Sequence, residues 1–552
     1  MGLVTNDWKI DILIAISTLC LLLYYKIKSI YTYFEKRNIK YVKPKFLLGS
    51  EPDGPLMKIH IAESWDRVYK KLENEKYGGF YHSILPMLMI RDPEYINDIL
   101  KTSFEHFPDR IFHVDGKTNP LDQHLFFIRG NKWRYLRSKL SPLFSQVKLK
   151  WMYEEIENCA NIFVECMKEI ADGKDVDMKE LLARCTTDVI SSCAFGVEPQ
   201  SLKDPNSEFR QIGKDFFDPN KINMLLTFFR IVIPRILLWF KIKTVTTRIR
   251  KFFLTTTENI LHQRRSTGLV RKDFVHLLLE LKEKGSVQID TKETEKNKTH
   301  DESTKENIEL TDTLLAAQSF VFFIAGFETT STTLHYTLYM LAKHKDIQDK
   351  ARKEVQEVKA KYGQFTFDSL KELKFLNNVI SETLRLHPPV TMLIRECTKD
   401  YTLPDGTFIE KGLNILIPTY SIQRDPKYFP EPLKFKPDRF ENPPANGTYL
   451  PFGDGPRICI GKRFAEAVVT TILARSLDKY EFDLSPMDKR GDEDIKLNPR
   501  VPTSTPLHGL FLRKARQCNK KTLTSLKEIP TVPETLQFSL DCRQKKFLVR
   551  SL

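Results

Sequence analysis

The chain has 552 residues, of which 41% are hydrophobic and 28% charged, a composition typical of a globular protein with many ionic groups on its surface. Its net charge of +15 suits an anionic membrane or an acidic protein partner, and no Arg-rich tract or nucleic-acid-binding motif supports nucleic acid as the partner. The nine cysteines are odd in number and show no C-x-x-C spacing, which argues against a disulfide framework and favours a reducing, cytosol-facing compartment.

An uncharged apolar stretch occupies residues 12–25 near the N-terminus. It is shorter than the about 20 residues that normally cross a bilayer, but Trp8, nearby tyrosines and flanking lysines can extend it. A cleaved signal peptide is the alternative, although no small-residue cleavage site follows. We therefore predict a single membrane anchor over residues 1–34, and the basic residues after it place the rest of the chain in the cytosol.

A globular body follows from about residue 35. Residues 104–130 are irregular and rich in aromatic side chains, as in segments that line pockets. Trp133 and Arg137 then stand four residues apart, so that on a helix an indole and a guanidinium share one face, a pattern that on its own more often makes a surface cation–π pair. Further helical patterns occupy residues 151–169, 178–195 and 208–217. The body is therefore predicted to be mainly helical.

Two later segments depart from this pattern. Residues 222–240 are unusually apolar but contain Arg230, Pro234 and Arg235, which argue against a second transmembrane helix. We expect a broken helix pair that dips into the membrane surface, with an ordinary buried helix pair as the alternative. Residues 283–309 are highly charged with almost no large apolar side chains, so they predict a mobile surface loop.

A long apolar helix is predicted from Thr311, its N-cap, to about Lys345, and would span about 50 Å. In its middle, the sequence Ala-Gly-Phe-Glu-Thr-Thr at 325–330 places a glycine, an acid and two threonines among apolar residues. Thr329 can turn its hydroxyl back to the carbonyl of Ala325 and bend the helix, which opens a groove. A kinked core helix is the alternative for this motif alone.

An ion-pair motif follows on a predicted helix, where Glu382 and Arg385 share one face. Arg439 offers a third member from a later segment. After the helix, strand-like residues lead to Arg395.

The last part of the chain is predicted to contain hairpins. Residues 400–417 alternate around a Pro-Asp-Gly turn, and residues 500–513 form a second candidate hairpin. Residues 515–552 are polar and basic, and no function follows from them.

Residues 451–461 read Pro-Phe-Gly-Asp-Gly-Pro-Arg-Ile-Cys-Ile-Gly and precede a helix-like run at 462–477. Cys459 therefore lies between a turn and a helix N-terminus, where backbone N–H groups and the helix dipole stabilise a thiolate, which is a metal ligand. The glycines allow a flat partner to approach the backbone, Phe452 keeps water from the sulfur, and Arg457 adds a cation. A buried structural cysteine is the alternative.

The positions of Phe452, Gly453, Gly455, Arg457, Cys459 and Gly461 resemble the haem-ligand loop of the cytochromes P450. The resemblance covers about residues 35–514 and implies haem b, iron protoporphyrin IX, with Cys459 as the axial ligand of its iron. The implied fold is mainly α with small β-sheets (α+β), the cytochrome P450 fold, with the haem between the long central helix and the Cys459 loop.

The same resemblance implies roles for the other motifs. The long helix would pass over the haem at Ala325, where Thr329 would hold the hydrogen bond to O₂ or water and Glu328 would relay protons. The residues implied to contact the haem or its propionates, besides the Cys459 loop with Phe452, Arg457 and Gly461, are Trp133, Arg137, Arg395 and Arg110. Glu382, Arg385 and Arg439 would form a structural triad behind the haem.

The implied protein is a microsomal monooxygenase, most like the insect family-six type. It would use NADPH electrons from NADPH-cytochrome P450 reductase, with cytochrome b5 as a second candidate donor, to insert one oxygen atom from O₂ into small apolar substrates such as xenobiotics, plant toxins, insecticides or hormones. It would lie in the endoplasmic reticulum membrane, as an anchor at 1–34, a catalytic domain at 35–514 and a disordered extension at 515–552, with no nucleic acid as partner. A haem-thiolate isomerase or dehydratase and a non-catalytic haem carrier are the alternatives, and Glu328 and Thr329 argue against both.

Overall fold

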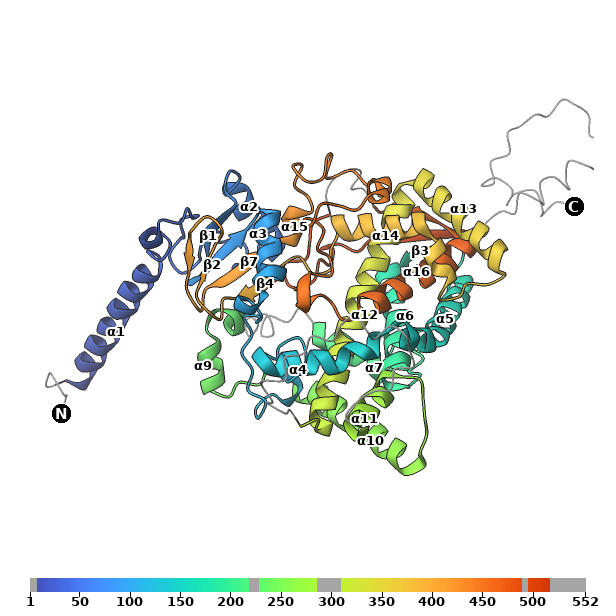
Figure 1. Ribbon diagram of the computed structural model, residues 1–552, viewed down its shortest axis with the longest axis horizontal. Coiled ribbons are helices and arrows are strands. Elements are labelled where there is room, and N and C mark those ends of the chain that lie inside the picture. The colour runs from blue at the N-terminus through green and yellow to red at the C-terminus, as the bar shows by residue number, and fades with distance from the viewer. Residues whose placement is uncertain (1–6, 218–227, 285–308, 489–494, 517–552) are drawn as a thin grey trace, which may run out of the picture.

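The predicted helices form and make up most of the body (Figure 1). The computed structural model describes residues 7–217, 228–284, 309–488 and 495–516. Its longer helices are α1 Trp8–Ile30, α2 Ile61–Lys71, α4 Gly130–Leu140, α5 Gln146–Glu169, α6 Met178–Phe195, α7 Glu208–Phe217, α10 Thr247–Thr267, α11 Phe274–Lys284, α12 Asp312–Lys343, α13 Lys345–Tyr362, α14 Lys374–Leu386 and α16 Lys462–Lys479. The short ones are α3 Pro93–Asn97, α9 Pro234–Trp239 and α15 Thr419–Ile422. The helices predicted at 178–195 and 208–217 are confirmed as α6 and α7, and α5 begins earlier than predicted.

Three small sheets accompany the helices, and the mainly α fold is confirmed. The strands are β1 Tyr77–His82, β2 Leu85–Ile90, β3 Asp175–Asp177, β4 Leu393–Glu396, β5 Tyr401–Thr402, β6 Phe408–Ile409, β7 Asn414–Ile417, β8 Tyr480–Leu484 and β9 Phe511–Arg516. The largest sheet has the order β1-β2-β7-β4, in which β2 and β7 are parallel and the other pairs antiparallel. It lies beside α2 and α3 at one end of the molecule, and most of the helices gather at the other (Figure 1).

The two predicted hairpins are only partly correct. Within 400–417, β5 and β6 pair across the turn, but β7 joins β2 and β4 in the large sheet. The chain reverses earlier than predicted for 500–513, since Leu497 forms an antiparallel bridge with Pro506, and β9 pairs with β8 and β3 instead. Local turn chemistry marks where a chain reverses, whereas strand partners from distant segments are chosen by packing.

Helix α12 is the central helix of the body. The Thr311 side chain caps it by accepting a hydrogen bond from the Leu314 N–H at 3.1 Å, as predicted. The helix packs against α6, α10, α14 and α16 and contributes apolar side chains to the main core. It therefore carries its middle residues, 325–330, into the centre of the molecule (Figure 1).

Helix α1 projects from the body (Figure 1) and has no buried residue. By length and composition α1 and α12 could both cross a membrane, but 61% of the apolar window of α12 is buried inside the protein, against none of that of α1. Only α1 therefore fits an anchor. Parts of three predicted segments, 222–227, 285–308 and 517–552, lie outside the described residues.

Candidate active site

The Cys459 loop has the predicted turn-to-helix geometry. A short 3₁₀ turn, Gly455–Arg457, precedes Cys459, and α16 begins at Lys462. The Cys459 N–H donates to the Phe452 carbonyl at 2.9 Å, which brings the two ends of the loop together. Burial raises the pKa of the Cys459 thiol, whereas the Gly461 N–H and the nearby guanidinium groups of Arg137 and Arg110 act in the opposite direction. The sulfur thus has the amide and the cations that stabilise a thiolate.

Two glycines of the loop serve different purposes. Gly455 has φ of +69°, and a Cβ there would lie 1.8 Å from the Leu100 carbonyl oxygen, so the protein's own backbone requires this glycine. A Cβ on Gly461 would meet no atom within 4 Å. The space beside Gly461 is therefore compatible with the predicted flat partner. At Gly455, in contrast, the glycine is needed because of the Leu100 carbonyl and not because of such a partner.

Arginine side chains gather beside the cysteine. Burial and the positive charges of Arg457 and Arg395 lower the pKa of Arg110 far below its usual range, and Arg137 and Cys459 also lie close enough to affect it. Burial lowers the pKa of Arg395 to about 10 and that of Arg457 to about 9. The buried Arg457 Nη1 and Arg395 Nε have no hydrogen-bond partner among the described residues. Among the described residues no acidic side chain pairs with Arg110 or Arg395, so the cluster can accept a further anionic partner, because buried unpaired cations are costly.

Arg457 is held by several contacts. Its guanidinium lies 4.0 Å from the centre of the Trp133 ring and donates to the carbonyls of Pro108 at 2.7 Å and Ile128 at 3.1 Å. It also pairs with Asp109 at 3.2 Å. Asp109 was not predicted, because its partner Arg457 is far away in the chain.

The middle of α12 contains the predicted threonine contact. Thr329 donates its hydroxyl hydrogen bond to the Ala325 carbonyl at 2.6 Å. Ala325 is exposed although it lies mid-helix, so Ala325 and Thr329 share an open face. A Cβ on Gly326 would lie 2.6 Å from Ile190 Cδ1 of α6, so this glycine permits the close packing of α6 and α12. The open face is therefore at Ala325, whereas Gly326 faces α6.

The Glu328 side chain contacts α6, whereas the Thr329 side chain contacts its own helix. Its side chain is buried and accepts a hydrogen bond from Lys179 Nζ of α6 at 3.0 Å. Glu328 also lines a pocket of about 360 Å³ with Arg210, Lys214 and Phe327. The predicted proton carrier is thus next to a pocket and an ammonium group that the sequence did not reveal.

The predicted triad forms as expected. Glu382 is fully buried and accepts from Arg385 at 2.7 and 2.9 Å and from Arg439 at 3.0 Å. Its Oε1 also accepts the Lys436 backbone N–H at 2.9 Å. The carboxylate therefore joins α14 to the segment that leads toward the Cys459 loop.

A cysteine just before a helix N-terminus and beside several arginines is an arrangement that can stabilise a thiolate, as haem-thiolate enzymes require. The family model described as "Cytochrome P450" matches residues 54–507, so the chain belongs to the cytochrome P450 family. Members are NADPH-dependent monooxygenases, oxidoreductases that carry haem b and receive electrons through a reductase, and this chain is one of them.

Curated relatives from insects match nearly the whole chain. It is 35% identical to "Cytochrome P450 6a2" of Drosophila melanogaster over 520 residues, which cover 92% of this chain and 99% of the relative. It is 37% identical to "Cytochrome P450 6k1" of Blattella germanica, over 87% of this chain and 93% of the relative. For "Cytochrome P450 6B7" of Helicoverpa armigera the identity is 34%, over 91% and 98%. The predicted likeness to the insect family-six type is confirmed.

Proposed function

We propose that Cys459 is the axial thiolate of the haem and that the chain oxidises small apolar foreign compounds. The observation that carries this proposal is the position of Cys459, beside the Gly461 amide and the cations of Arg110 and Arg137. When bound, the haem supplies the oxygen-activating chemistry that a thiolate ligand favours. The test is a reduced CO-difference spectrum followed by NADPH consumption and product formation with purified reductase. A thiolate-type band without NADPH-linked product would favour an isomerase, a dehydratase or a carrier.

The arginine cluster fits the two propionate carboxylates of haem b. Arg395 and Arg457 carry buried positive charge and each has an unpaired N–H group among the described residues, and Arg110 is partly buried beside them. Carboxylates are the natural partners of such groups. Arg137 and Trp133 would complete the propionate side, whereas Phe452, Gly461 and Ala325 would contact the ring.

Thr329 and Glu328 would have different roles in proton delivery. The Thr329 hydroxyl lies on the open face of α12 and is held by the Ala325 carbonyl, so its oxygen can accept a hydrogen bond at the reacting centre. Glu328 is next to a pocket from which it can take up protons. We assign Thr329 to the final hydrogen bond and Glu328 to the supply of the proton.

Replacing Thr329 by alanine should leave the haem-thiolate spectrum intact, because the side chain contacts only its own helix among the described hydrogen bonds. The variant should consume NADPH but release hydrogen peroxide in place of most of the product, since the hydrogen bond that controls proton delivery is gone. The measurement is the ratio of product and peroxide to NADPH. Unchanged coupling would remove Thr329 from the mechanism.

We expect the substrate to bind beside an aromatic group on the 104–130 segment. Phe112, Phe126 and Phe127 contact one another, and His124 joins them to Phe320 of α12. Aromatic linings accept many apolar molecules because they impose few directional bonds. We expect this aromatic group to line the substrate pocket, where xenobiotics, plant toxins, insecticides and hormones would all be accepted.

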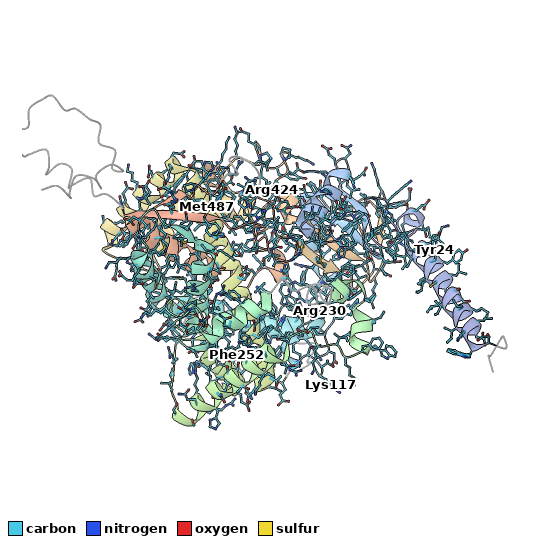
Figure 2. The ribbon with its side chains drawn as sticks, turned by 180° about the vertical axis from the view of Figure 1, so that it is seen from behind. Tyr24, Lys117, Arg230, Phe252, Arg424 and Met487 are labelled. Atoms are coloured by element: carbon cyan, nitrogen blue, oxygen red, sulfur yellow. The ribbon has the colours of Figure 1, made fainter. Side chains whose placement is uncertain are left out.

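The catalytic domain would rest on the cytosolic face of the endoplasmic reticulum membrane, to which α1 anchors it. Trp239 is 78% and Phe240 61% exposed at the end of α9, which Figures 1 and 2 show at the same end of the molecule as α1. Arg230, which argued against a buried span, pairs with the buried Asp122 at 2.7 Å. The exposed aromatic side chains at the end of α9 support its insertion into the membrane surface.

Brominated lipids should therefore quench Trp239 in the full chain reconstituted in vesicles. The variant Trp239→Tyr should lose most of the quenching that does not come from the anchor, because an inserted indole lies at the depth of the upper acyl chains. Trp151→Tyr is the matched control, since Trp151 is also exposed, at 41%, but lies on α5. Equal quenching in both variants would contradict insertion of α9.

The reductase would dock on the side of the Cys459 loop. Exposed basic side chains on the loop's neighbouring elements are Lys101, which pairs with Asp454 of the loop, Lys132 and Arg134 of α4, and Arg463 of α16. Cationic surfaces steer acidic partners and speed their encounter. The same surface could receive cytochrome b5, and competition between the two donors would show a shared site.

A further inference from the structure

A glutamine of α12 holds a distant segment in place. The Gln318 side chain is 1% exposed, and its Oε1 accepts a hydrogen bond from the Leu125 N–H at 2.9 Å. Its Nε2 donates to the carbonyl of Gln123 and to that of Leu314 on its own helix, both at 3.1 Å. The carboxamide therefore fixes the backbone on both sides of His124, which lies between Gln123 and Leu125.

Gln318 lies on the same face of α12 as Ala325 and Thr329. Ala325 follows Gln318 by seven residues and Thr329 by eleven, which is close to two and three turns of an α-helix. Gln318 is therefore about 10 Å from Ala325 along the helix axis. The backbone that Gln318 holds thus lies on the side of α12 where the proposed chemistry takes place.

The His124 side chain is buried among aromatic rings. It is 3% exposed, and its ring centre lies 4.4 Å from that of Phe127 and 6.0 Å from that of Phe320. Its Nδ1 has no hydrogen-bond partner among the described residues. Burial and the positive charges of Arg230 and Arg110 lower the pKa of this imidazole to about 3. It is therefore neutral at neutral pH and offers one hydrogen-bond donor and one acceptor.

The same aromatic group is connected to the proposed haem site through Arg110. The Arg110 side chain donates to the Phe126 carbonyl at 2.8 Å, and its guanidinium lies 4.0 Å from the centre of the Phe126 ring. The Phe126 ring centre lies 5.4 Å from that of Phe127, which packs on His124. A substrate between these rings and the haem would therefore lie close to His124.

The unpaired Nδ1 of His124 needs a hydrogen-bond partner, because a buried polar atom without one is costly. We propose that His124 is the polar contact of the substrate pocket and that Gln318 is the positioning residue that holds it there. The preferred substrates are elongated apolar molecules that carry one hydroxyl or carbonyl oxygen and are oxidised at a carbon well away from it. This inference rests on the oxidation of small apolar compounds proposed above.

The test compares decanol, a straight-chain primary alcohol, with decane, which differs from it only by the hydroxyl. Affinity is measured from the change in haem absorption that the bound molecule causes. In His124→Phe the preference for decanol over decane should fall by roughly tenfold, the effect of one buried hydrogen bond. Decane itself should bind unchanged, because the phenyl ring keeps the aromatic packing. His124→Asn should keep part of the preference, since its amide also offers a donor and an acceptor.

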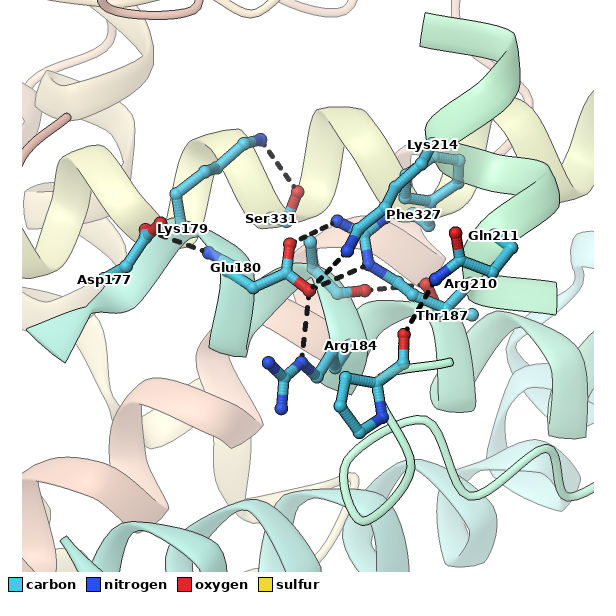
Figure 3. A network of polar contacts seen from close by, with 12 residues as sticks. Asp177, Lys179, Glu180, Arg184, Thr187, Arg210, Gln211, Lys214, Phe327 and Ser331 are labelled. Carbon is cyan, nitrogen blue, oxygen red and sulfur yellow. Dashed lines mark hydrogen bonds and ion pairs between the residues drawn. The ribbon is translucent and has the colours of Figure 1, made fainter. Parts of the chain in front are cut away.

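Gln318→Met should lower the same preference and spread the oxidation of decanol over more carbons, because the backbone around His124 is released. The double variant should show no less preference than His124→Phe if Gln318 acts through His124. Gln211→Met is the matched control. Gln211 lies on α7 and donates to the Pro205 carbonyl at 3.1 Å, as Figure 3 shows, so its loss should leave the preference unchanged.

The outcomes separate this proposal from the one on which it rests. An unchanged preference in His124→Phe would overturn the role of His124 and show that water or ring packing satisfies its imidazole. A lowered preference in His124→Phe but not in Gln318→Met would overturn only the role of Gln318. Failure of the unchanged enzyme to bind either decanol or decane would overturn the apolar pocket itself.

Discussion

Replacing Cys459 by serine should abolish the thiolate-type absorption of the reduced, CO-bound protein. A coordinating thiol is deprotonated outright, and the strong donation of its sulfur gives the spectrum its character. A serine hydroxyl has no comparable anion near neutral pH, although it could keep the Phe452 hydrogen bond, which uses the backbone. The loop should therefore fold while the spectrum and the NADPH-linked product are lost.

Cys166→Ser is the matched control for this variant. Cys166 lies near the C-terminal end of α5, where burial and the acidic Glu169 raise the pKa of its thiol, so its surroundings stabilise a thiolate less than those of Cys459 do. Its replacement should leave the absorption unchanged. Survival of the thiolate band in Cys459→Ser, or its loss in Cys166→Ser, would mean that another sulfur binds the iron.

The features that the sequence predicted correctly are those that one segment encodes. The N-cap Thr311, the Thr329 contact with Ala325 and the Glu382–Arg385 pair each join residues three or four positions apart on one helix. Helical geometry brings such residues together in any protein. The Cys459 loop is local in the same way.

The features that the sequence did not reveal join distant segments. Asp109 meets Arg457, Lys179 meets Glu328, and Ile190 fills the space beside Gly326. No spacing rule connects such residues, because tertiary packing alone sets their distance. The partners of β9 were missed for the same reason. The sequence therefore indicated the residues that we propose to react but not the distant residues that contact them.

The Glu382 carboxylate links the stability of the fold to the Cys459 loop. It holds Arg385 of α14 and Arg439, and Arg385 also donates to the Gln423 carbonyl at 2.7 Å. The Gln423 side chain in turn accepts the Leu450 N–H at 2.8 Å, at the entrance to the loop. Loss of the Glu382 carboxylate should therefore disturb the position of Cys459.

Glu382→Gln should lower the free energy of unfolding by about 3–5 kcal/mol, the usual effect of removing one partner from a buried ion pair. Two guanidinium groups would remain without their anion. The hydrogen bonds that connect Arg385 through Gln423 to Leu450 would then no longer hold the Cys459 loop in position. We expect denaturant unfolding at lower concentration and faster release of haem, which its absorbance would follow.

The control Glu357→Gln removes an exposed pair with Lys353, 3.9 Å long, and should change neither quantity because solvent screens exposed ions. Equal stability of both variants would show that Arg385 is held by its carbonyl contacts, and that the buried carboxylate does not govern the loop.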